Sequence, residues 1–159
     1  MSARAEALAK QFEAQAAEMT STLEKLTDAD WKKVTTAEKW PVGVTAHHVA
    51  GAHESIAGLV KTLATGGQMP GLTMAMIDEG NAKHAVDFAN CTRAETLALH
   101  KKGVATATAM VRGLSDAELD RTATVLKEMP AMSAQQAIEM VLINHIDGHL
   151  KSIRATVGG

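Results

Sequence analysis

The stretch VTAHHVAGAHESIAGLV, residues 44–60, has the periodicity of a helix that is apolar along one face. At about 100° per residue, apolar side chains recur within an arc of about −40° to +80° around His48. These side chains are Val44, Ala52, Ile56, Leu59 and, just beyond the stretch, Leu63. His47 falls at about −100° and His53 at about +140°. We therefore expect His48 on the core face, His47 in solvent and His53 at the rim.

A second stretch, NHIDGHLKSIR at residues 144–154, places His145 and His149 one helical turn apart on the apolar side of a helix. Buried imidazoles without partners are costly, so these two side chains need a third group. If the two helices run antiparallel, His48 meets them. Three neutral imidazoles with an open fourth position are typical of a catalytic site for zinc or a related divalent ion.

Other readings of the histidines remain open. An isolated pair of histidines four residues apart is also compatible with structural or surface side chains. Cys91 is an alternative fourth ligand, whereas His84 and His100 lie in polar segments and are not expected to bind metal. The paired Glu-x-x-His motifs of a di-iron bundle are absent from the sequence.

Helical periodicity extends over most of the chain and predicts an all-α four-helix bundle that forms a single domain, residues 1–159. The long helices are expected at about residues 4–26, 44–64, 92–112 and 134–156. About 25 residues connect the second and third of them and include a shorter helix at about 73–89. This connection could travel the length of the bundle and allow helices two and three to run parallel. No strand is predicted.

The composition limits the classes of partner. The formal net charge is −2, and Lys and Arg are scattered, so nucleic acid is not an expected partner. The charged N-terminal segment resembles neither a signal peptide nor a membrane span, which predicts a cytoplasmic protein without a membrane partner. A single cysteine, Cys91, fits a reducing compartment.

Three segments carry a resemblance to a known family: DADWKKVTTAEKWPVGVTAHHVAGAHE at 28–54, IDEGNAKHA at 77–85 and LINHIDGHLKSIRATV at 142–157. Together they resemble the DinB-like superfamily of metal-binding four-helix bundles, which includes bacillithiol transferases and mycothiol-dependent maleylpyruvate isomerases. The resemblance covers nearly the whole chain. It implies an up-down-down-up bundle, a homodimer, and a metal held by His48, His145 and His149.

The resemblance also bears on the substrates. The first position of the closing pair is usually glutamate in the isomerase branch, so His145 makes the chain more similar to the bacillithiol-transferase and general DinB branch. Asn81 matches a polar position near the family's site, which implies contact with a cofactor, a substrate or a water at the metal; a helix cap or a loop hydrogen bond is the alternative. Trp31 and Trp40 are expected to anchor the long loop by packing.

The leading hypothesis is a metal-dependent thiol S-transferase that brings a low-molecular-weight thiol to a small-molecule electrophile. The expected metal is zinc, with nickel, iron or manganese as alternatives. The competing hypotheses are a hydrolase using metal-bound hydroxide and a non-catalytic, stress-related metal- or ligand-binding bundle. A purely structural metal is a further possibility. The sequence does not identify the thiol, the electrophile or the metal.

Overall fold

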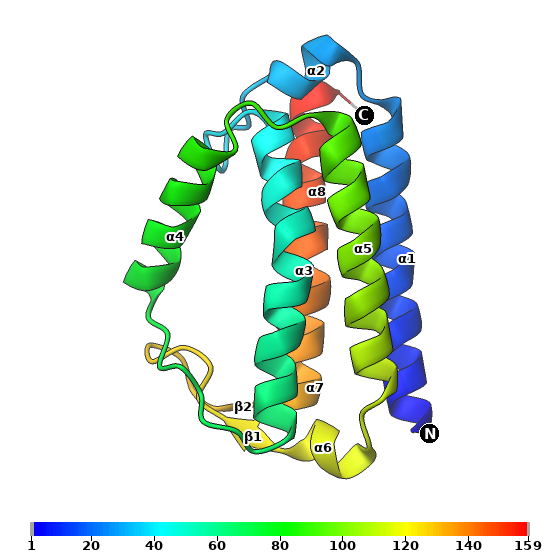
Figure 1. Ribbon diagram of the computed structural model, residues 1–159, viewed down its shortest axis with the longest axis vertical. Coiled ribbons are helices and arrows are strands. Elements are labelled where there is room, and N and C mark those ends of the chain that lie inside the picture. The colour runs from blue at the N-terminus through cyan, green and yellow to red at the C-terminus, as the bar shows by residue number, and fades with distance from the viewer. Residues whose placement is uncertain (1, 159) are drawn as a thin grey trace.

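The computed structural model describes residues 2–158 and consists mainly of helices (Figure 1). The all-α prediction is confirmed. The elements are α1 (Ala3–Lys25), α2 (Asp28–Lys32), α3 (Val42–Ala64), α4 (Met74–Asp87), α5 (Arg93–Arg112), α6 (Asp116–Asp120), β1 (Thr122–Ala123), β2 (Met132–Ser133), α7 (Ala134–Ala137), the π-helical segment η1 (Ile138–Ile143) and α8 (Asn144–Val157). Within the described residues, no helix is both long and apolar enough to cross a membrane.

The bundle helices run in two directions (Figure 1). The long arm of α7, η1 and α8 runs parallel to α1, because Arg4 bonds Gln135 near one end and Arg154 bonds Glu18 farther along. Helices α3 and α5 both run the opposite way, and the Cys91 thiol just before α5 donates to the Gly43 carbonyl at the start of α3. Helix α4 makes this possible, because its 14 residues carry the chain back along the bundle before α5 begins.

Small residues bring α3 and α5 close together. A Cβ atom added at Gly103 of α5 would lie 3.0 Å from the His53 Cβ and 3.2 Å from the Ala50 carbonyl oxygen. The most buried face of α3 consists of Ala46, Val49, Ala50, His53, Ala57, Val60 and Ala64. That face is centred near His53, so the expectation that His53 lies at the rim is wrong. Alanine contributes little to an apolar stripe in the sequence, yet it allows the close helix contact.

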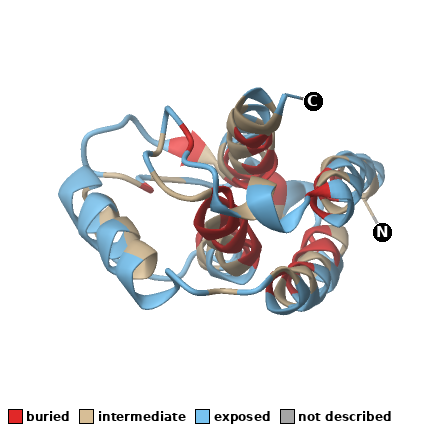
Figure 2. Cartoon of the chain, turned by 90° about the horizontal axis from the view of Figure 1, so that it is seen from above, coloured by how far each residue is buried: buried red, intermediate tan, exposed pale blue. Residues whose placement is uncertain are grey.

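The buried residues gather on the sides of the bundle helices that face one another (Figure 2). His53 pairs with His100 in this interior, and each residue is 1% exposed. His100 Nε2 lies 3.0 Å from the Ala16 carbonyl oxygen, which can only accept, so this nitrogen carries the proton. His100 Nδ1 must then accept from His53 Nε2–H at 2.9 Å. The pair is therefore satisfied as two neutral rings, and the polar sequence around His100 gave no sign of its burial.

Two local features differ from the sequence prediction. Strands β1 and β2 form an antiparallel ladder of two residue pairs, too short to leave an alternating pattern in the sequence. The predicted regular helix over 134–156 is interrupted by η1, whose wider turn changes the direction of the side chains that follow it. The interruption ends immediately before the segment that carries His145 and His149.

Trp31 anchors the loop between α1 and α3, as expected. Its indole Nε1–H donates to the Cys91 carbonyl oxygen at 2.9 Å, and the ring packs directly on Gly43. A Cβ atom at Gly43 would overlap the indole ring. Glycine is thus required at this position by close approach of a large side chain.

Replacing Gly43 with alanine should destabilise the protein by about 1–3 kcal/mol, because the Trp31 indole must move away from Gly43 and lose its hydrogen bond to the Cys91 carbonyl oxygen. Gly58→Ala is the matched control in the same helix, since nothing lies within 4 Å of a Cβ atom there. That variant should gain about 0.5–1 kcal/mol from helix propensity. Urea unfolding of both variants measures the difference, and equal effects would contradict the packing argument.

The buried pair also predicts how stability depends on pH. Burial lowers the pKa of His53 from 6.5 to about 3, so the unfolded state binds a proton that the folded state excludes between these values. The free energy of unfolding should fall as the pH drops from about 6.5 towards 3, by up to about 1.4 kcal/mol per pH unit for each such histidine. Urea unfolding of chelator-treated protein at several pH values measures this slope.

The double variant His53→Leu/His100→Leu provides the control for this prediction. The remaining histidines are present in both proteins, so a shallower slope in the double variant isolates the buried pair. A slope identical to that of the parent protein would contradict the assignment.

Candidate metal centre

Three histidines from two antiparallel helices converge at one side of the bundle. His48 of α3 and His145 of α8 lie with their Nε2 atoms 3.0 Å apart. The His149 ring centroid is 5.0 Å from that of His48 and 4.7 Å from that of His145. Each residue offers one nitrogen to a group whose members all lie within 4.8 Å of one another. The structure thus brings together the three residues that the sequence singled out.

These histidines lie at the margin of the core and are half-buried. The fully buried face of α8 is formed by Ile146, Leu150 and Ile153, about a quarter-turn away from the histidines. On α3 the deepest face is centred near His53. The expectation that His48, His145 and His149 occupy the core faces is therefore corrected: they lie where α3 and α8 meet at the edge of the core, and solvent or a ligand can reach them.

The surroundings keep at least two of the rings neutral. Burial, together with the neighbouring His145 and His149, lowers the pKa of His48 to about 3. Burial and the neighbouring His149 likewise lower the pKa of His145 to about 4. At neutral pH both imidazoles therefore keep a lone pair, which is the form that binds a metal ion.

Glu38 bonds the third histidine, His149, a role that the sequence analysis did not predict. Its carboxylate accepts from His149 Nδ1 at 2.7 Å and from the Ser152 hydroxyl at 2.6 Å. Burial acts to raise the pKa of Glu38, but the hydrogen bonds from Ser152 and His149 outweigh it and hold the pKa below its usual value. The carboxylate stays ionised, so it fixes the tautomer of His149 with the proton on Nδ1 and leaves Nε2 free.

The short loop before α3 delivers Glu38 to the site. Val34 and Pro41 pair across its base, and the Thr35 N–H donates to the Trp40 carbonyl oxygen at 2.8 Å. Lys39 at its tip has a left-handed backbone, with φ of 61°. The same loop sets Trp40 against His48, with ring centroids 5.3 Å apart in an edge contact. Trp40 is consequently part of the wall of the site as well as a packing residue.

Helix α4 covers a neighbouring part of α3. His84 of α4 bonds His47 Nδ1 through Nε2 at 2.8 Å, and Phe88 stacks on His47 with centroids 4.1 Å apart. His47 is 8% exposed, so the expectation that it lies in solvent is wrong. The reason is that α4 covers the face of α3 that the other three bundle helices leave open. His84 also makes an edge contact with the His48 ring.

Two other predicted residues lie outside the three-histidine group. Cys91 donates its thiol to Gly43 at the start of α3, at 3.3 Å, and is not a member of the group, so the alternative of a fourth cysteine ligand fails. Asn81 lies on the half-buried face of α4, one turn before His84. Contact between Asn81 and a ligand stays a prediction.

The donor set fits a divalent ion. Two nitrogens bound to one zinc ion at about 2.0–2.1 Å in tetrahedral geometry lie about 3.3–3.4 Å apart, close to the separation of His48 Nε2 and His145 Nε2. His149 has its Nδ1 directed at a carboxylate, the usual support for a metal-binding imidazole. His145 Nδ1 is buried and has no hydrogen-bond partner in the protein, so His145 lacks the supporting contact that His149 has.

Comparison with known proteins identifies related folds. A family model described as the DinB superfamily matches residues 11–153. Two crystal structures of mycothiol-dependent maleylpyruvate isomerase, one of them a mutant, superpose with TM-scores of 0.76 and 0.74 at 15% sequence identity. Each alignment covers 96% of this chain and 63% of the isomerase chain. This chain therefore spans less than two thirds of the length of those structures. No curated protein matches the sequence.

The Glu38 contact predicts a graded effect on metal affinity. Glu38→Gln keeps the shape but removes the charge that supports His149, so zinc affinity should fall by about 10- to 100-fold while the stoichiometry at saturating zinc stays the same. His48→Ala should instead abolish stoichiometric binding. Competition with a chromophoric chelator measures both effects.

Glu18→Gln is the control. Glu18 of α1 is an exposed carboxylate that bonds Arg154 of α8, the helix that also carries His149. Its zinc affinity should equal that of the parent protein. If Glu18→Gln and Glu38→Gln weaken zinc equally, Glu38 has no specific supporting role.

Proposed function

Since the chain belongs to the DinB superfamily, we propose that it is a metal-dependent enzyme that transfers a low-molecular-weight thiol to an electrophile. The observation that carries the proposal is the group of His48, His145 and His149, with Glu38 behind His149. This arrangement offers three nitrogens and no fourth protein ligand within the group. Catalytic zinc sites use three protein ligands, whereas structural sites use four. We take zinc as the metal, with nickel, iron or manganese as alternatives.

A divalent ion bound there would stabilise a thiolate and so lower the pKa of a thiol from its free value of about 8.5 towards neutrality. The residues of the chain supply the setting. His48 and His145 add no charge at neutral pH, so an anionic partner is favoured over a neutral one. Glu38 keeps the ring of His149 in one orientation, and Trp40 shields the edge of His48 from water.

The transfer itself needs no dedicated protein base. The thiol loses its proton to water, the sulfur forms a new bond to the electrophilic carbon, and the leaving group departs with the electrons of the broken bond. A thiol role is supported by the structural likeness to isomerases whose name specifies mycothiol as the thiol they depend on. At 15% identity this likeness does not carry the choice of thiol to this chain. We propose Asn81 as a residue that contacts the cofactor or substrate from α4.

The experiment titrates cobalt-loaded protein with bacillithiol, mycothiol, glutathione and a simple monothiol. We expect at least one thiol to produce a sulfur-to-cobalt charge-transfer band, and the same thiol to be transferred to monochlorobimane. The His48→Ala variant should lose both the band and the transfer, while circular dichroism reports whether it retains its helical fold.

If no thiol produces the band and no transfer exceeds the His48→Ala background, the transferase proposal fails. A stoichiometric metal with ester or amide hydrolysis would then favour the hydrolase. A stoichiometric metal with no turnover would favour a non-catalytic metal- or ligand-binding bundle.

A further inference from the structure

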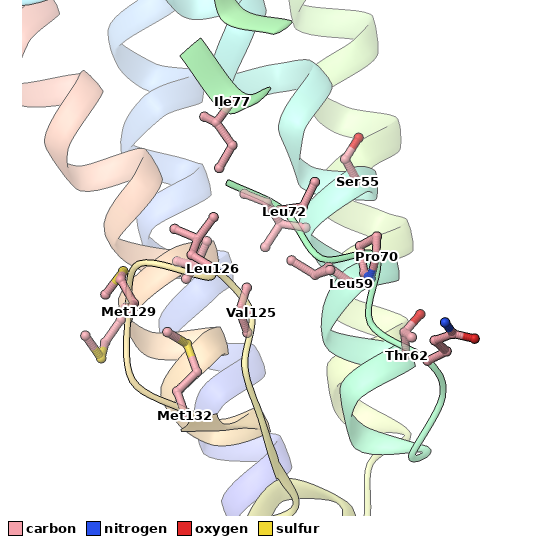
Figure 3. Close-up of a pocket in the computed structure, with 14 residues that line it drawn as sticks. Ser55, Leu59, Thr62, Pro70, Leu72, Ile77, Val125, Leu126, Met129 and Met132 are labelled. Atoms are coloured by element: carbon pink, nitrogen blue, oxygen red, sulfur yellow. The ribbon is translucent and has the colours of Figure 1, made fainter. Parts of the chain in front are cut away.

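A second feature of the molecule is an apolar pocket of about 650 Å³ that none of the seven histidines lines (Figure 3). It lies between α3, the start of α4, the loop joining β1 to β2, and η1. Leu59, Ile77 and Leu126 face it from three of these elements (Figure 3). Its volume is in the range of pockets that bind small molecules.

The walls of the pocket are held together by hydrogen bonds. The Lys127 N–H of the β1–β2 loop donates to the Leu72 carbonyl oxygen at 2.9 Å. The Glu128 carboxylate accepts from the Met74 N–H, at 3.1 and 3.2 Å, where α4 begins. The loop and the start of α4 are therefore fixed relative to each other, and the pocket is a formed cavity between them.

The lining selects an uncharged aliphatic ligand. Of the 14 lining residues none is charged and none is aromatic. The three polar ones are Ser55, Thr62 and Gln68, and the Thr62 hydroxyl already donates to the Gly58 carbonyl oxygen. No lining residue carries a positive charge to balance a carboxylate, and none carries an aromatic ring to stack on a planar group. Burying an unpaired charge there would be costly.

Methionines give this lining some adaptability. Met129, Met132 and Met140 form one side of the pocket, and Met129 and Met140 are 38% and 52% exposed. Methionine is unbranched and flexible, so it can fit aliphatic groups of different shape. The two exposed side chains also leave apolar surface that a ligand would cover.

The pocket and the three-histidine site are neighbours along α3 and along the arm formed by η1 and α8, and α4 borders both. Ser55 follows His48 by seven residues on α3, and Ile77 precedes His84 by seven on α4, which is two helical turns in each case. Val141 of η1 precedes His145 by four residues. Two turns correspond to about 10 Å along a helix. A chain of several carbons seated in the pocket can therefore extend its head group towards the histidines.

We propose that this pocket binds the aliphatic part of an uncharged second substrate, whose reactive end points to His48, His145 and His149. The role as a substrate site rests on the transferase function proposed above; the binding of aliphatic chains does not. The reaction is the same S-transfer, with the aliphatic electrophile supplying both the carbon that is attacked and the leaving group.

The test measures binding in metal-free protein with N-octyl dansylamide, an uncharged fluorescent probe whose octyl chain can enter the pocket. Displacement by 1-butanol, 1-hexanol and 1-octanol should tighten about fourfold for each added CH₂ until the cavity is filled. Octanoate should displace the probe at least about tenfold more weakly than 1-octanol, because none of the residues that line the pocket is cationic.

Two matched variants locate the binding. Met140→Glu puts a charge at the pocket, whereas Met76→Glu puts the same charge on α4 at a residue that does not line it; the two methionines are 52% and 49% exposed. Met140→Glu should weaken 1-octanol by about tenfold or more, and Met76→Glu should leave it unchanged. The inference is overturned if the parent protein does not bind the probe, if octanoate equals 1-octanol, or if both variants lose binding equally.

A second measurement separates this inference from the proposed function. Transfer of the active thiol to 1-bromobutane, 1-bromohexane and 1-bromooctane should show kcat/KM rising with chain length, and Met140→Glu should remove the rise. Met140→Glu should not alter the sulfur-to-cobalt band. Probe binding without any thiol transfer supports the pocket and refutes the transferase. Transfer without dependence on chain length refutes the pocket as the substrate site and leaves the transferase standing.

Discussion

The close approach of α3 to α5 is the constraint on which the rest of the structure depends. Gly103 allows α5 to pack against Ala50 and His53, and this contact makes α3 the central helix. With that face occupied, the stripe containing His48 is turned towards α8 at the edge of the core. A larger side chain at Gly103 would crowd α3 and alter the direction in which His48 points. The position of the site thus depends on packing between α3, which carries His48, and α5, which carries none of the three histidines.

The seven histidines fall into three groups with different chemistry. His53 and His100 form a closed pair in the core, because a backbone carbonyl fixes the proton on one ring and the other ring completes the chain of hydrogen bonds. His47 and His84 bond to each other under Phe88. The remaining group, His48, His145 and His149, brings one nitrogen from each of three rings within 4.8 Å of one another, and this convergence makes it the candidate metal centre.

The three-histidine group and the apolar pocket offer different chemical surroundings at neighbouring positions along α3. Neutral imidazoles and one supporting carboxylate suit a cation and an anionic sulfur, whereas the uncharged aliphatic lining suits the carbon skeleton of a substrate. Helix α4 borders both regions, with His84 beside His48 and Ile77 in the pocket wall. A short helix outside the four-helix core therefore borders both the three-histidine group and the pocket.

The sequence by itself determined the helical class, the approximate helix ends, the DinB resemblance and the choice of His48, His145 and His149, because these follow from local periodicity, capping and motif spacing. Only the tertiary structure decided which helix faces are deepest, that His47 and His53 are buried, and that Glu38 supports His149. Glu38 and His149 are 111 residues apart, and no periodic pattern links a turn residue to a helix at that separation. Burial of α3 depends on which helices surround it, and alanine and glycine, whose small size permits that packing, leave only a weak signal in a single sequence.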